Sequence, residues 1–151
     1  MAISGRSLPR LASVVFPALM LMAPDALAQQ ERTAAGKWQC QHASQSRNNN
    51  PFDTWTYNFV LTLGADGAFQ VEGSYYSMSA GFSVATSAQG QWQQGVYQQT
   101  GNQAVAAQGQ EVRQDGTTLP FVLVFLNVTP NVMSNNHNGP AGAILTHCQR
   151  S

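Results

Sequence analysis

Apolar and polar residues alternate along much of the chain with a period of two, which is typical of half-buried β-strands. The clearest alternation is in residues 55–63, where one face collects the apolar side chains Trp55, Tyr57, Phe59, Leu61 and Leu63. The sequence GADG at 64–67 then suits a tight turn, and residues 68–77 resume the alternation. These positions predict a β-hairpin.

The alternation continues towards the C-terminus. Beyond the hairpin, strands are predicted in 81–102 (two strands), 103–113, 118–128 and 143–148. Gly90 and Gly95 suit bulge or turn points, and Asp115-Gly116 suits a second tight turn. We therefore predict an all-β fold: a single antiparallel up-and-down β-barrel of about eight strands, with a β-sandwich as the alternative.

Residues 118–128 (TLPFVLVFLNV) are apolar on both faces of the predicted strand. A strand with one solvated face would alternate, so this run predicts that both faces are covered. The outer cover would be either the long loop predicted at 129–142 or a second subunit. The protein is accordingly expected to be a monomer or a weak homodimer.

The first 28 residues have the features of a secretory signal peptide. Arg6 and Arg10 are followed by an apolar run at 11–24 and by a small-residue cleavage site that ends at Ala28. The apolar run is shorter than the roughly 20 residues that a bilayer span needs. We therefore predict a signal peptide at 1–28 and one domain at 29–151, exported to the periplasm or beyond, with no membrane span after cleavage.

The charge balance argues against a nucleic-acid partner. Residues 29–151 carry five basic and six acidic side chains, so they offer no basic stripe that could neutralise phosphates. Gln, Asn, Ser and Thr supply most of the polar surface, because charged residues are only 9% of the chain.

The two cysteines, Cys40 and Cys148, lie near opposite ends of the predicted domain. Export and an even cysteine count favour a disulfide, and a barrel would bring the first and last strands together so that it can form. A metal site that adds His42 and His147 is the alternative. Adjacent residues on a strand point to opposite faces, however, so His147 and Cys148 would not converge on one ion.

The triplet GKW at 36–38 resembles the G-x-W signature of the lipocalin and calycin group. In that group the tryptophan plugs the base of the barrel, and an arginine after the last strand packs across it. Arg150 stands at the matching place. The resemblance implies that Gly36, Trp38 and Arg150 form a packed barrel base.

A small β-barrel of this kind would bind a small apolar ligand in its mouth. The candidate contact residues are the aromatic side chains of the predicted middle strands: Tyr75, Tyr76, Phe82, Trp92 and Tyr97. Ordinary core packing is the competing explanation for each of them.

The sequence contains no nucleophile elbow, zinc-protease motif or Walker loop, so we expect no catalytic residue, no metal and no cofactor. Glu72 and Glu111 are assigned to solvent-facing positions. The alternative function is an envelope protein-interaction module, such as a hydrolase inhibitor or an assembly accessory, that acts through the 129–142 loop. The polar tip of that loop would consist of Asn135, Asn136, His137 and Asn138.

Overall fold

The computed structural model describes residues 32–48, 50, 52, 54–138 and 142–151, so the predicted signal peptide lies outside the described residues. The nine strands are β1 (Gly36–Ser46), β2 (Trp55–Leu63), β3 (Ala68–Ser77), β4 (Ser83–Tyr97), β5 (Asn102–Arg113), β6 (Thr118–Phe125), β7 (Asn127–Val128), β8 (Val132–Asn138) and β9 (Gly142–Arg150). The all-β prediction is confirmed. No helix among the described residues is long and apolar enough to cross a membrane.

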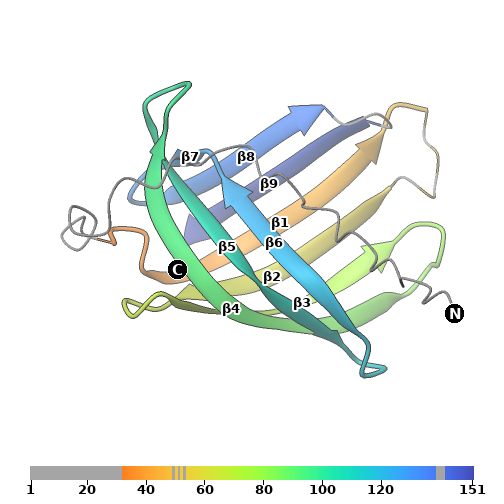
Figure 1. The fold of residues 1–151 in the computed structure, drawn as a ribbon. Coiled ribbons are helices and arrows are strands. Elements are labelled where there is room, and N and C mark those ends of the chain that lie inside the picture. The colour runs from red at the N-terminus through yellow and green to blue at the C-terminus, as the bar shows by residue number, and fades with distance from the viewer. Residues whose placement is uncertain (1–31, 49, 51, 53, 139–141) are drawn as a thin grey trace, which may run out of the picture. The chain divides into compact units, whose positions relative to one another are not determined.

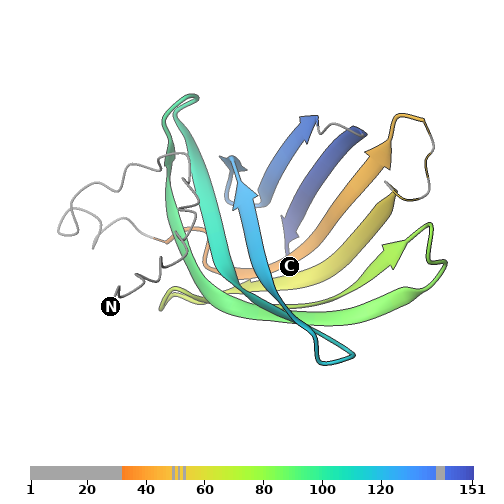
Figure 2. The ribbon, with the colours of Figure 1, turned by 45° about the vertical axis from the view of Figure 1, so that its right-hand side comes forward.

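All nine strands belong to one antiparallel sheet with the order β6-β5-β4-β3-β2-β1-β9-β8-β7. The sheet curls strongly into an open, barrel-like half shell, as Figures 1 and 2 show. The prediction of about eight strands differs by one as the net of three differences: β4 is one strand where two were predicted, β8 was not predicted, and Leu126 divides the predicted strand 118–128. Its first part, β6, pairs with β5, and its last part, β7, pairs with β8.

Among the described residues, hydrogen bonds join the two edges of the curled sheet near Leu126. The amide of Leu126 donates to the carbonyl oxygen of Ser134 at 3.2 Å, and Asn135 Nδ2 donates to the carbonyl oxygen of Val124 at 3.0 Å. Among the described residues, no ladder joins the earlier part of β6 to β8. The described sheet is therefore a half barrel, with an open seam between β6 and β8.

The first and last strands pair within this sheet, as predicted. Cys40 lies directly opposite Cys148 in the β1–β9 ladder, and the two form a disulfide across 108 positions of sequence. The disulfide uses both thiols, so it rules out the alternative Cys/His metal site. His147 lies on the opposite, exposed face of β9.

The concave face holds the core at one end of the sheet. Its largest fully buried side chains are Trp38, Phe69, Phe125, Leu61, Leu63, Met133, Val71, Val105 and Cys148. They come from seven strands whose inward positions follow the period of two that the sequence shows.

Two predictions about individual segments are wrong. Residues 83–97 form the single strand β4 rather than two strands, because Gly90 continues the ladder with Gly109. The predicted loop at 129–142 contains β8, which pairs with β9. Within the chain, the outer face of β6 is covered only in part, since Val122 is 53% exposed whereas Val124 is half-buried.

Gly90 and Gly109 lie directly opposite each other in the β4–β5 ladder. A Cβ on Gly90 would collide with the carbonyl oxygen of Gln108 and would lie 2.6 Å from the Cα of Gly109. Glycine therefore allows the tight curl of the sheet at this point.

We predict that replacing Cys40 and Cys148 with alanine lowers the free energy of unfolding by roughly 3–5 kcal/mol, because the disulfide closes a loop of 108 positions. Urea unfolding of the native and the double-variant proteins measures the difference. Native protein in excess reductant should behave like the variant. Equal midpoints for all three samples would contradict the prediction.

A second prediction concerns β4. Gly90→Ala should lower the free energy of unfolding by roughly 2–3 kcal/mol, because the new Cβ would strain the β4–β5 contact. Gly95→Ala is the matched control in the same strand, since a Cβ there would meet no atom within 4 Å. Denaturant melts of the two variants should separate, and equal stability would exclude a role of Gly90 in the curl.

Candidate functional site: the mouth of the curled sheet

The base of the half shell is sealed by a tryptophan and an arginine. The guanidinium of Arg150 lies 4.3 Å from the ring centroid of Trp38 and donates to the carbonyl oxygens of Ala35 and Thr33 at 2.9 and 2.8 Å. Gly36 has φ +137°, and a Cβ there would collide with the Arg150 side chain. The structure thus brings together Gly36, Trp38 and Arg150 as a structural unit.

The opposite end, which we call the mouth, is where β1, β3, β5 and β8 end and where β2, β4, β6 and β9 begin. At this end, one row of inward side chains runs across the neighbouring strands β8, β9, β1, β2 and β3. Each residue in the row is paired with the next in the ladder: Asn135, Thr146, His42, Tyr57 and Tyr75. A second row nearer the rim consists of His137, Ile144, Ser44, Trp55 and Ser77. Polar and aromatic residues therefore replace the aliphatic core at this end.

The buried polar residues of the described structure are Ser44, Thr86 and Thr146, and all three lie in this half. The Thr146 hydroxyl is 2.7 Å from His42 Nδ1, and the Thr86 hydroxyl donates to the Tyr57 hydroxyl at 2.8 Å. These bonds offset the loss of water around the groups.

Aromatic rings form one wall of the mouth. The Trp55 ring lies 4.8 Å from the His42 ring and 5.8 Å from the Tyr75 ring, centroid to centroid. Tyr57 stacks on Phe59 at 4.6 Å. Trp55, Tyr75 and His42 stay partly exposed, so this wall is accessible from solvent, whereas Trp38 and Phe69 at the base are buried.

Burial shifts two titrating groups of the mouth. It lowers the pKa of His42, the charge of His137 lowers that pKa further, and a hydrogen bond with the backbone of Leu145 opposes both effects. Burial also raises the pKa of the Tyr57 hydroxyl; the Thr86 hydrogen bond opposes this shift, and the charge of Glu111 adds to it. At neutral pH the centre of the mouth therefore presents an uncharged imidazole and an intact phenol.

Glu111 lies on the concave face, so its predicted solvent-facing position is wrong. Its side chain is only 17% exposed and forms an ion pair with Arg113 at 3.2 Å. This pair is the charged part of the mouth wall on β5. Glu72, by contrast, lies on the exposed outer face of β3 as predicted.

Of the five predicted ligand contacts, only Tyr75 lies in the mouth. Tyr76 points outward from the same strand, and Phe82 is exposed in the β3–β4 connection. Trp92 is buried at the base, where its Nε1 donates to the Gly64 carbonyl oxygen at 2.8 Å, and Tyr97 ends β4 at the same end.

The residues predicted as a loop tip fall on β8 instead. Asn135 and His137 share the inward face of that strand, and Asn136 and Asn138 lie on the exposed outer face. The structure therefore places these four residues on two faces of one strand rather than in a loop.

Sequence reasoning missed the central residues of the mouth: His42, Trp55, Tyr57, Thr86 and Thr146. A signal was present, because His42 follows Trp38 and Cys40 on the same face of one strand. Trp55 and Tyr57 likewise share the apolar face of β2. Counting inward positions to the end of each strand would have found them.

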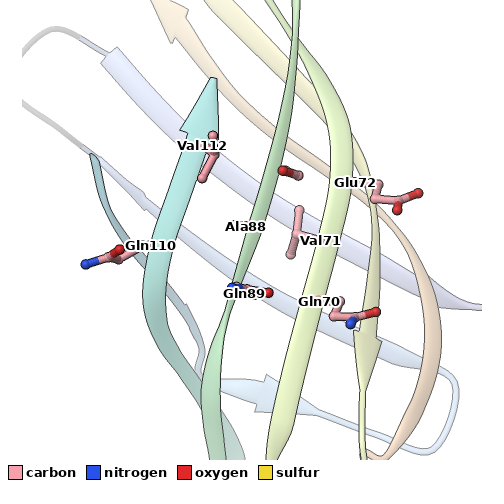
Figure 3. A pocket seen from close by; sticks show the side chains of 8 residues that line it. Gln70, Val71, Glu72, Ala88, Gln89, Gln110 and Val112 are labelled. Atoms are coloured by element: carbon pink, nitrogen blue, oxygen red, sulfur yellow. The ribbon is translucent and has the colours of Figure 1, made fainter. Parts of the chain in front are cut away.

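A hollow lies on the outer face of β3, β4 and β5 (Figure 3). It has a volume of about 320 Å³ and is bordered by a row of three directly paired glutamines, Gln70, Gln89 and Gln110. Long exposed amides form its walls, and its floor is the sheet itself. The mouth, with buried hydroxyls and fixed rings, is the better organised site.

No group of three or more His, Cys, Asp or Glu side chains in the described ranges is placed to hold a metal ion. Comparisons with protein-family models, with curated proteins and with solved structures found no match to this chain. The function must therefore be inferred from the geometry of the chain itself.

We predict that His42 makes the folded protein sensitive to acid. Its pKa is lowered from 6.5 on folding, so between the lowered pKa and 6.5 the unfolded chain binds more protons. The free energy of unfolding should consequently fall as the pH drops below about 6.5. His42→Gln should make this slope shallower, as measured by urea unfolding at a series of pH values.

His147→Gln is the matched control, because it removes a histidine from the exposed outer face of the neighbouring strand. This variant should keep the acid sensitivity of the native protein. Identical slopes for the native protein and His42→Gln would show that His42 is not the group responsible.

Proposed function

We propose that this protein is a non-enzymatic binding protein that takes a small, largely apolar ligand into the mouth of the half shell. The observation that supports this function is the arrangement of partly exposed aromatic rings and hydroxyl groups above a sealed apolar base. Ligand sites of small β-barrels typically combine an apolar lining with a few fixed polar groups in this way.

The lining suggests the chemistry of the ligand. Trp55 and Tyr75 offer faces on which a flat apolar group can pack. The Tyr57 hydroxyl accepts a hydrogen bond from Thr86 and can still donate its own proton to a ligand oxygen. We therefore infer a ligand that is flat, uncharged and carries a carbonyl or hydroxyl group.

A binding role fits these groups better than a catalytic one. General acid–base catalysis by histidine commonly uses a carboxylate that orients the ring. Here the described contacts of His42 are with the Thr146 hydroxyl, the Trp55 ring and the Leu145 backbone. These contacts hold the ring as part of a wall.

The disulfide and the base support the rest of the proposal. A Cys40–Cys148 bridge is stable in an oxidising compartment, which supports export to the periplasm or the cell exterior. The packing of Trp38 under Arg150 supports a lipocalin-like arrangement in which one end of the barrel is sealed and the other end binds.

We predict that an uncharged, flat dye with a carbonyl group, Nile red, binds in the mouth. Tyr75→Ala and Trp55→Ala should each weaken its binding roughly tenfold, because each removes an aromatic face from the wall. Fluorescence titration of the dye measures the dissociation constants.

Tyr76→Ala is the matched control, since it removes the same side chain from the outer face one residue further along β3. It should leave the dissociation constant unchanged. Equal losses for Tyr75→Ala and Tyr76→Ala, or no binding of the dye by the native protein, would contradict a ligand site in the mouth.

A further inference from the structure

Three large apolar side chains stand in solvent beside the mouth. Phe52 is 79% exposed, Met78 is 52% exposed and Phe82 is 62% exposed. Phe52 belongs to the β1–β2 connection, and Met78 and Phe82 belong to the β3–β4 connection. We call these three residues the apolar rim.

The two connections that carry the apolar rim are neighbours. They flank the start of β2, and the amide of Met78 donates to the carbonyl oxygen of Thr54 at 3.0 Å. Figures 1 and 2 show the β3–β4 connection at the same end of the sheet as the end of β1 and the start of β2. The rim residues are therefore grouped at one end of the molecule.

The connections at the opposite end have a different composition. Residues 64–67, 98–101 and 129–131 are small or polar, with sequences GADG, QQTG and TPN. The exposure of large apolar groups in the connections is thus specific to the mouth end of the described structure. Exposed apolar groups that gather at one place commonly mark an interaction site.

We propose that the apolar rim docks this protein on the surface of an electrically neutral lipid bilayer. Loop tips that insert into the bilayer interface need no shape-complementary partner, which suits three separate protruding side chains. A protein partner would ordinarily require about 800 Å² of matching surface on each side. The small residues between Met78 and Phe82 do not provide such a surface.

The hydrogen bonding and the charge of the two connections both favour docking on a neutral bilayer. The amide of Gly81 donates to the Ser77 carbonyl oxygen at 3.0 Å, so part of the loop backbone is satisfied before it leaves water. By sequence the two connections carry one basic residue, Arg47, and one acidic residue, Asp53, so their formal charges cancel and they have little attraction for anionic headgroups. Docking in this orientation would turn the mouth towards the bilayer.

The test uses the protein expressed with its own leader, purified after export and checked by intact mass. Flotation with phosphatidylcholine vesicles measures partitioning. The triple variant Phe52→Ser, Met78→Ser and Phe82→Ser should bind these vesicles at least about tenfold more weakly than the native protein. A control that replaces the exposed Val96, Val122 and Leu145 with serine should bind as the native protein does.

A second measurement keeps the test independent of the stability of the triple variant. The single variant Phe82→Trp should show quenching of the new tryptophan by brominated phosphatidylcholine beyond that of the native protein. The proposal would be overturned if the native protein did not bind phosphatidylcholine vesicles, or if the triple variant and the control partitioned equally. A protein partner at the rim would produce the first of these two results.

Discussion

The pairing of β1 with β9 is the constraint on which the rest of the structure depends. Inward positions recur every second residue along this ladder, so three successive pairs share one face: Trp38 with Arg150, Cys40 with Cys148, and His42 with Thr146. The disulfide at the middle pair fixes the register. If β9 shifted by one residue against β1, the three inward residues of one strand would all point to the outer face. One ladder therefore sets the base, the centre and the mouth together.

The two halves of the concave face have different relations to stability. At the base, buried rings and aliphatic groups contribute through the hydrophobic effect, and the Arg150 cation on Trp38 adds to it. In the mouth, the hydroxyls of Thr86 and Thr146 must be hydrogen-bonded to avoid a net penalty on burial. Aliphatic residues there would have given a simpler core, so stability alone does not account for the polar half.

Much of the fold could be predicted from sequence. The alternation of apolar and polar residues and the tight-turn sequences are local signals that predict strands and hairpins, and the two cysteines predict a contact between the ends of the domain. The strand β8 was missed because VMSNNHN has no apolar alternation: its inward residues Asn135 and His137 line a polar mouth. Glu111 was misplaced for the same reason, since a charged residue on an inward face breaks the rule that identifies faces. Sequence patterns thus failed where the concave face becomes polar, which is where the candidate site lies.

The mouth end inverts the usual distribution of polarity in a soluble protein. Hydroxyl groups and an imidazole face inward there, whereas Phe52 and Phe82 face water on neighbouring connections. The hydrogen-bonded hydroxyls avoid a net penalty, but neither they nor the exposed apolar side chains add the hydrophobic stabilisation that the base provides. The buried base and the central disulfide supply stability for the whole sheet, so the mouth end can keep polar inward groups and exposed apolar ones. We infer that recognition is concentrated at the mouth because the fold tolerates there what it excludes from its base.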